Sequence, residues 1–129
     1  MAVPKKALAN PVHDAARQAF TESVEEWQTQ LGLGDWRMHV SDQPAKRCAA
    51  DVSLDLEARL ATIRIGESTG TAAVTPDNIE GLACHEVLHV FLCELIGLCR
   101  SPGVSESTIN SAEHRVVNTL QRLLTIGKP

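Results

Sequence analysis

The strongest constraint on the fold is an apolar stretch in the second half of the chain. Its apolar residues fall on every side of a helix rather than on one stripe; they are Ile79, Leu82, Val87, Leu88, Val90, Phe91, Leu92, Leu95 and Ile96. Thr75 followed by Pro76 is typical of a helix start, and Gly97 is typical of a helix end. A helix that is apolar all round is a buried helix. We therefore expect a central helix from about Thr75 to Ile96.

This expected helix contains the pattern His-Glu-x-x-His, formed by His85, Glu86 and His89. Residues four apart lie on one face of a helix, so the two imidazoles can point to the same place. Two imidazoles at this spacing can bind one zinc ion, and Glu86 can act as base on a metal-activated water. The alternative is a pair of core histidines that hydrogen-bond to the backbone or to each other.

A catalytic zinc site has three protein ligands, so a third ligand must come from another element. Residues 105–127 predict a last helix with an apolar stripe of Ile109, Ala112, Val116, Leu120 and Leu123. Glu113 falls on that stripe, and a carboxylate on a buried face is costly unless it is paired or bound to metal. We predict Glu113 as the third ligand, with its neighbour His114 as the alternative. Cys93, four residues after His89, could instead complete a structural site, but a buried thiol is the simpler interpretation.

The first half of the chain predicts one helix followed by three short strands. Asn10 and Pro11 are typical of the start of an amphipathic helix, which Gly32 ends. The apolar period then becomes two, which is typical of strands. These strands would span residues 36–41, 51–56 and 61–65. Their short links favour an antiparallel meander. The expected class is therefore α+β, with a first helix, a three-stranded, mainly antiparallel sheet, the central helix and a last helix that carries the third ligand, in that order along the chain.

The composition indicates one folded domain. The chain has 129 residues, 43% of them hydrophobic, which is enough for one core. We expect a flexible arm over residues 1–9 and a single domain over residues 10–127. The net charge of −4 argues against nucleic acid binding, and no segment is expected to span a membrane. Residues 1–10 lack the apolar core of a secretory signal, so free cysteines and a cytoplasmic location are expected.

The chain resembles the zincin metallopeptidases of the gluzincin type, in which a His-Glu-x-x-His helix is followed by a glutamate on a later helix. It is more similar to the short metallopeptidase-like proteins encoded by phages and prophages, which are minimal zincins of the SprT-like and ImmA-like kind. The similar segments are residues 35–40, 61–65, 85–89 and 113–120. The resemblance implies that His85, His89 and Glu113 bind one zinc ion. It also implies that Glu86 is the general base of a peptidase.

The expected function is zinc-dependent hydrolysis of a peptide or protein substrate. Such a substrate would add to a sheet edge as a further strand, and Ala61 to Ile65 is the expected edge. The chain has no tyrosine to stabilise an oxyanion, so His39, Arg100 and His114 are the candidates for that role. The alternative is a zinc-binding accessory or regulatory module, for instance a phage protein, with a structural metal and no turnover. The sequence indicates neither the substrate nor the oligomeric state.

Overall fold

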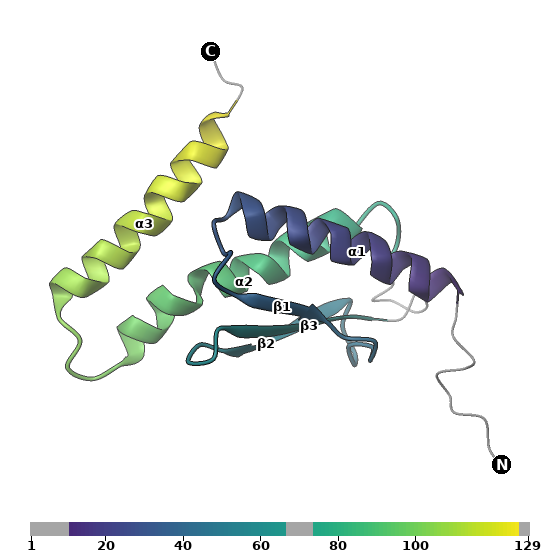
Figure 1. The fold of residues 1–129 in the computed structure, drawn as a ribbon, viewed down its shortest axis with the longest axis horizontal. Coiled ribbons are helices and arrows are strands. Elements are labelled where there is room, and N and C mark those ends of the chain that lie inside the picture. The colour runs from purple at the N-terminus through teal and green to yellow at the C-terminus, as the bar shows by residue number, and fades with distance from the viewer. Residues whose placement is uncertain (1–10, 67–73, 127–129) are drawn as a thin grey trace.

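Figure 1 shows the computed structural model, which describes residues 11–66 and 74–126. Within these residues the chain forms three helices and a three-stranded sheet. The elements in chain order are α1 (Pro11–Gln30), β1 (Arg37–Val40), β2 (Ala50–Asp55), β3 (Leu60–Ile65), α2 (Ile79–Arg100) and α3 (Glu106–Thr125). The predicted α+β class is confirmed. The expected arm at residues 1–9 lies outside the described residues.

The sheet is mixed, with the strand order β1-β3-β2. β2 pairs antiparallel with β3, so that Val52 lies opposite Ile63. β1 pairs parallel with β3 on the other side, with Val40 opposite Ile63. The expected antiparallel meander is therefore wrong, because the chain between β1 and β2 crosses over and leaves room for β3. A period of two shows that a strand forms but not which strand it pairs with.

This order also makes β3 the central strand of the sheet. β3 is hydrogen-bonded on both sides, so the expectation that Ala61 to Ile65 forms a free edge is wrong. Among the described residues the edges of the sheet are β1 and β2. A substrate strand could add only to one of these two.

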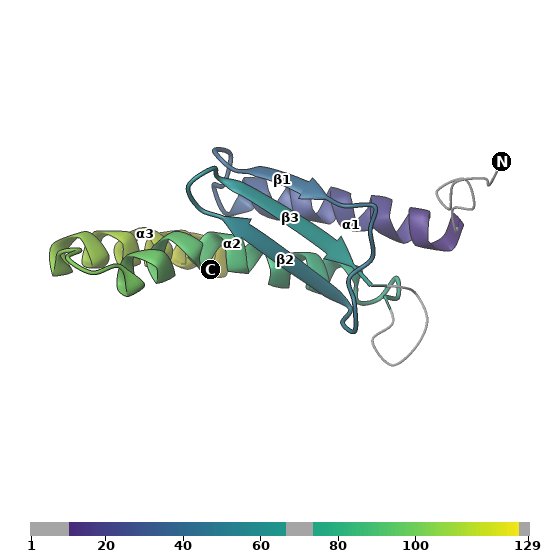
Figure 2. The ribbon, with the colours of Figure 1, turned by 90° about the horizontal axis from the view of Figure 1, so that it is seen from below.

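The core lies between one face of the sheet and the helices α1 and α2. Figures 1 and 2 show both helices on the same face, while the other face is open. Alternate residues of β3 point inward, and Ala61, Ile63 and Ile65 are all buried. The largest fully buried side chains come from α1, β3 and α2; they are Phe20, Val24, Ile63, Ile65, Val87 and Val90. This packing fixes α2 against the sheet.

The helix α2 begins later and ends later than predicted. The side chain of Asn78 accepts a hydrogen bond from the backbone N–H of Thr75 at 2.8 Å, so this segment forms a turn before the helix starts. At the other end the helix passes through Gly97. A Cβ at Gly97 would lie 3.0 Å from Cδ2 of Leu56. This glycine therefore allows close approach of helix and sheet and does not end the helix.

The composition of α2 indicated a helix buried on all sides, but in the structure only one side is buried. Its buried residues are Ile79, Ala83, Glu86, Val87 and Val90, which lie toward the sheet and α1. Ile96 is 42% exposed. By length and composition α2 could cross a membrane, contrary to expectation, but the core helix of a soluble protein meets the same criteria. The helix thus has one packed side and one side that is open to solvent, on which His85 and His89 are exposed.

The helix α3 turns back from the end of α2 and runs in the opposite direction (Figure 1), and Arg122 near its end donates a hydrogen bond to the backbone oxygen of Gln30 at 3.0 Å. Ser105 caps it, since the serine hydroxyl accepts a hydrogen bond from the backbone N–H of Thr108 at 3.1 Å. Among its described residues Ala112 is the only buried one. Val117 and Leu124 are 51% and 71% exposed. This helix is therefore the least packed element of the fold.

Candidate metal centre

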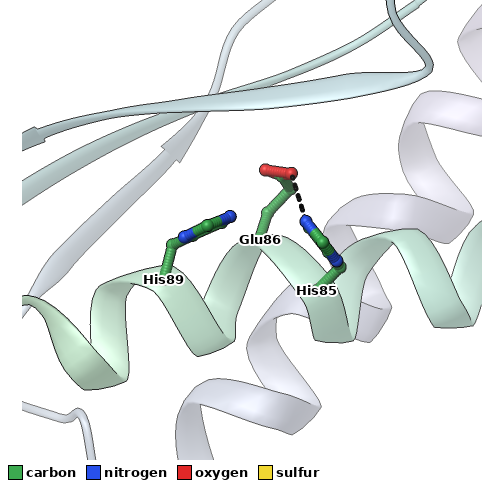
Figure 3. Close-up of side chains that lie close together, drawn as sticks. All are labelled: His85, Glu86 and His89. Atoms are coloured by element: carbon green, nitrogen blue, oxygen red, sulfur yellow. Dashed lines mark ion pairs between the residues drawn. The ribbon is translucent and has the colours of Figure 1, made fainter.

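Three potential metal ligands, His85, Glu86 and His89, lie together near the middle of α2. Their ligand atoms are all within 4.8 Å of one another. The two imidazole centroids are 5.0 Å apart, and Nε2 of His85 lies 3.9 Å from Oε1 of Glu86. Figure 3 shows the carboxylate between the two rings, on the side of the helix that faces the strands. The grouping needs only the helical spacing of 3.6 residues per turn.

The three side chains differ in their access to solvent. The side chain of Glu86 is 7% exposed, whereas that of His85 is 68% exposed. His89 is also exposed. The alternative of two core histidines is therefore excluded. The burial holds the carboxylate in place, while the imidazoles stay open to solvent and to an ion.

The surroundings of Glu86 change its acidity. Burial raises the pKa of its carboxyl above the usual value for glutamate, because the charged form loses its hydration. His85 and His89 lower the pKa in part, and Asp51 of β2 raises it further. A carboxylate with a raised pKa is a stronger base. The influence of Asp51 could not be foreseen, because only the fold brings β2 beside α2.

The donor set suits a divalent metal ion. Zinc bonds to imidazole nitrogen and to carboxylate oxygen at about 2.0–2.2 Å, so two donors of one tetrahedral ion lie about 3.3 Å apart. Because both rings are exposed, small rotations about their side-chain bonds would bring the donors to that separation. The group could therefore hold a metal ion. Within the described part of the chain, no further His, Cys, Asp or Glu joins it.

The structure does not bring Glu113 or His114 to this group. Both are exposed on α3, so the expected burial of Glu113 is wrong. The helix packs through Ala112 instead, and adjacent residues lie about 100° apart round a helix. Nδ1 of His114 lies 3.0 Å from the backbone oxygen of Asn110. That either residue supplies a third ligand stays a prediction.

The remaining candidates also lie outside the group. His39 is exposed on β1, and Arg100 is exposed at the last position of α2. Cys93 is a partly buried free cysteine, and burial raises the pKa of its thiol. A raised pKa disfavours the thiolate that would bind zinc. The structure therefore gives no support to a site formed by His85, His89 and Cys93.

A second polar cluster lies at a cavity of about 260 Å³ beneath α3. The guanidinium of Arg59 lies 5.7 Å from the ring centroid of Trp36 and 3.8 Å from a carboxylate oxygen of Glu94. Arg115 of α3 lies 3.4 Å from the same carboxylate. The sequence carried no signal for this cluster, because its members come from four separate segments. It ties α3 to the rest of the molecule through exposed ion pairs, which are individually weak.

Comparison of the chain with protein-family models, with curated proteins and with solved structures found no match.

Proposed function

We propose that this chain is a zinc-dependent peptidase in which His85 and His89 bind the metal and Glu86 is the general base. The observation that supports this most is the placement of a buried carboxylate between two exposed imidazoles on one helix. A base needs a fixed position and a raised pKa, and metal ligands need access to the ion. Glu86 meets the requirements of the base, and His85 and His89 meet that of the metal ligands.

In this proposal, bound zinc would lower the pKa of a water molecule toward 7 and polarise the carbonyl of the scissile bond. Glu86 accepts the proton of the attacking water and then donates it to the leaving amine. Its burial keeps bulk water from competing for that proton. The exposed face of α2 leaves room for a substrate at the imidazoles.

The edge strand β2 is the proposed position for the substrate backbone. Asp51 on this strand acts on Glu86, and Leu56 just after it packs against Gly97. β2 therefore runs along α2 past the histidines. Its outer edge is free of other strands among the described residues, and an extended peptide can add to such an edge.

The substrate would be a peptide with apolar side chains. Leu54 on β2 is 38% exposed and Ile96 on α2 is 42% exposed, so both elements that border the site offer apolar surface. A peptide side chain that covered these residues would gain hydrophobic contact. Replacement of Leu54 by lysine would then select against apolar residues next to the cleaved bond.

The test is a proteome-derived peptide library treated with the purified protein with and without zinc. Wild type should yield zinc-dependent products, and Glu86→Gln should lower the rate by about 10²–10⁴-fold. Glu94→Gln is the matched control, because Glu94 lies on the same helix but belongs to the other cluster. If wild type binds zinc and the library stays uncleaved, the peptidase proposal fails.

That last result would support the second candidate, a zinc-binding accessory or regulatory module without turnover. One observation favours it: apart from Glu86, which a peptidase needs as its base, the described residues bring no further ligand to the two histidines. A module of this kind should bind zinc equally well in wild type and in Glu86→Gln. Its zinc content after purification without chelator measures this directly.

A further inference from the structure

On two helices of this molecule, the residues of one exposed face follow each other at the same spacing, in steps of four, three and four positions along the chain. On α2 the face consists of His85, His89, Leu92 and Ile96, which we call the histidine stripe. On α3 it consists of Glu113, Val117, Leu120 and Leu124, which we call the glutamate stripe. Each stripe has a polar metal-binding end and an apolar end. Neither stripe contains a buried residue, and three of the five apolar residues are over 40% exposed.

Within one chain the two stripes do not face each other. The cavity beneath α3 is lined from α2 by Val90, Phe91, Glu94 and Leu95, and from α3 by Ala112 and Val116 among others. At about 100° per residue, the α2 residues of this lining lie about 180° round the helix from the histidines. The helix α3 of the same chain thus packs on the opposite side of α2. The histidine stripe is left without a partner.

The stripes are complementary when the two helices run parallel. Steps of four and three are those of helices that pack side by side with interlocking side chains. In parallel register Glu113 lies beside His85 and His89, while Leu120 and Leu124 meet the apolar end of the histidine stripe. In antiparallel register Glu113 would lie beside Ile96. Only the parallel register brings a carboxylate to the imidazoles and apolar side chains to apolar side chains.

The connection between α2 and α3 rules out this register within one chain. To bring Glu113 level with the histidines, a parallel α3 would have to start about 30 Å back along α2 from its end. The connection is Ser101–Ser105, which spans about 20 Å at most. Figure 1 shows α3 turned back in the opposite sense. A parallel partner helix must therefore come from another chain.

We propose that the glutamate stripe of a second copy docks in parallel on the histidine stripe, and that Glu113 of that copy is the third ligand of the metal. This inference rests on the proposed function, which assigns the metal to His85 and His89. The charges match, since an ion held by two neutral imidazoles keeps its double positive charge until a carboxylate joins it. Because α3 of the same chain lies on the opposite side of α2 from the histidine stripe, the contact is head to tail, and repeated contacts would join copies in an open series with one metal site at each junction.

The first test follows the mass of the protein during a zinc titration by analytical ultracentrifugation. Wild type should change from monomer to larger assemblies as zinc is added, and a chelator should reverse the change. Leu124→Glu should abolish the assemblies, and since Leu124 is 71% exposed the folded monomer should persist. Glu25→Gln, an exposed change on α1, is the control that should assemble normally.

The second test mixes two variants, each of which lacks one part of the shared metal site. Glu113→Gln keeps both histidines, and His89→Ala keeps Glu113. Each variant alone should bind zinc at least about tenfold more weakly than wild type, because even outer-shell partners of a ligand contribute that much. A mixture should recover one tight site per pair of chains, in which the histidines and the glutamate come from different copies.

The outcomes separate the two proposals. Tight zinc binding by a wild-type monomer, with no recovery in the mixture, would overturn the shared site and leave the peptidase proposal standing. Absence of zinc binding by wild type at any concentration would overturn both. Recovery in the mixture together with zinc-dependent assembly of wild type is the result expected here.

Discussion

Replacement of Glu86 by glutamine should make the metal-free protein more stable at neutral pH, although it removes the proposed base. The side chain of Glu86 is 7% exposed, and its one described ion-pair contact is His85 at 3.9 Å. Burial raises the pKa of this carboxyl, so the folded state resists its ionisation. Near the ordinary glutamate value of about 4.3 the unfolded chain ionises first. Stability therefore falls as the pH rises from there through the raised pKa of the folded state.

The size of the effect follows from the burial of an unsatisfied charge. An unsatisfied buried polar group costs about 1–3 kcal/mol, and a charged one costs more than a neutral amide of the same shape. The gain in the free energy of unfolding for Glu86→Gln is then about 1–2 kcal/mol at pH 7. With an entropy of unfolding of about 2.1 cal/mol/K per residue, a gain of this size raises Tm by about 4–7 °C for a chain of 129 residues.

Thermal unfolding with chelator present measures this at pH 7 and again near pH 4. The gain should be present at pH 7 and should disappear near pH 4, where both states of the wild-type carboxyl are protonated. Glu94→Gln is the control of opposite sign, because Glu94 is 44% exposed and pairs with Arg59 and Arg115. A lower Tm for Glu86→Gln at pH 7, or a gain that persists unchanged at pH 4, would refute the reasoning.

Three further outcomes concern the fold and its thiols. Gly66→Ala should destabilise the protein by about 1–3 kcal/mol in a urea titration, because a Cβ there would collide with the carbonyl oxygen of Cys48; an unchanged midpoint would contradict this. Phe20→Ala, at a side chain with no exposure, should cost about 3–5 kcal/mol by the same measurement, and a loss under 1 kcal/mol would show that Phe20 is not a core anchor. Cys99, which is exposed, should be alkylated faster than Cys93, whose thiol has a pKa raised by burial; mass spectrometry of the labelled peptides decides the order.

Much of the local structure could be predicted from the sequence. The helix predicted from Asn10 to Gly32 agrees with α1, and the three stretches with a period of two overlap β1, β2 and β3 to within one or two residues at each end. The predicted last helix over residues 105–127 agrees with α3, which Ser105 caps. These features follow from neighbouring residues, through side-chain periodicity and end capping. The grouping of His85, Glu86 and His89 could also be predicted, because the helix alone brings these neighbouring residues together.

What could not be predicted depends on contacts between distant segments. Nothing in β1 indicates that its partner is β3 rather than β2, because both are short and apolar on alternate residues. The burial of Glu113 was inferred from an apolar stripe that is wider than the surface α3 buries. Gly97 is typical of a helix end by its residue type, and only its contact with Leu56, which is distant in the sequence, shows that it serves close packing instead. In each case the structure depends on a contact with a segment that is distant in the sequence.

The strand order has a consequence for how the molecule folds. β2 and β3 are joined by the short connection Leu56–Arg59, whereas β1 reaches β3 only after the chain from Ser41 to Arg59 is closed into a loop. Closing a longer loop costs more chain entropy, so the hairpin of β2 and β3 should form first and β1 should dock late. The histidines need only a turn of α2 to come together, while Glu86 becomes buried only when the hairpin packs on that turn. In the proposed peptidase, the two histidines could thus bind an ion before Glu86 is buried, and catalysis would wait for the last steps of folding.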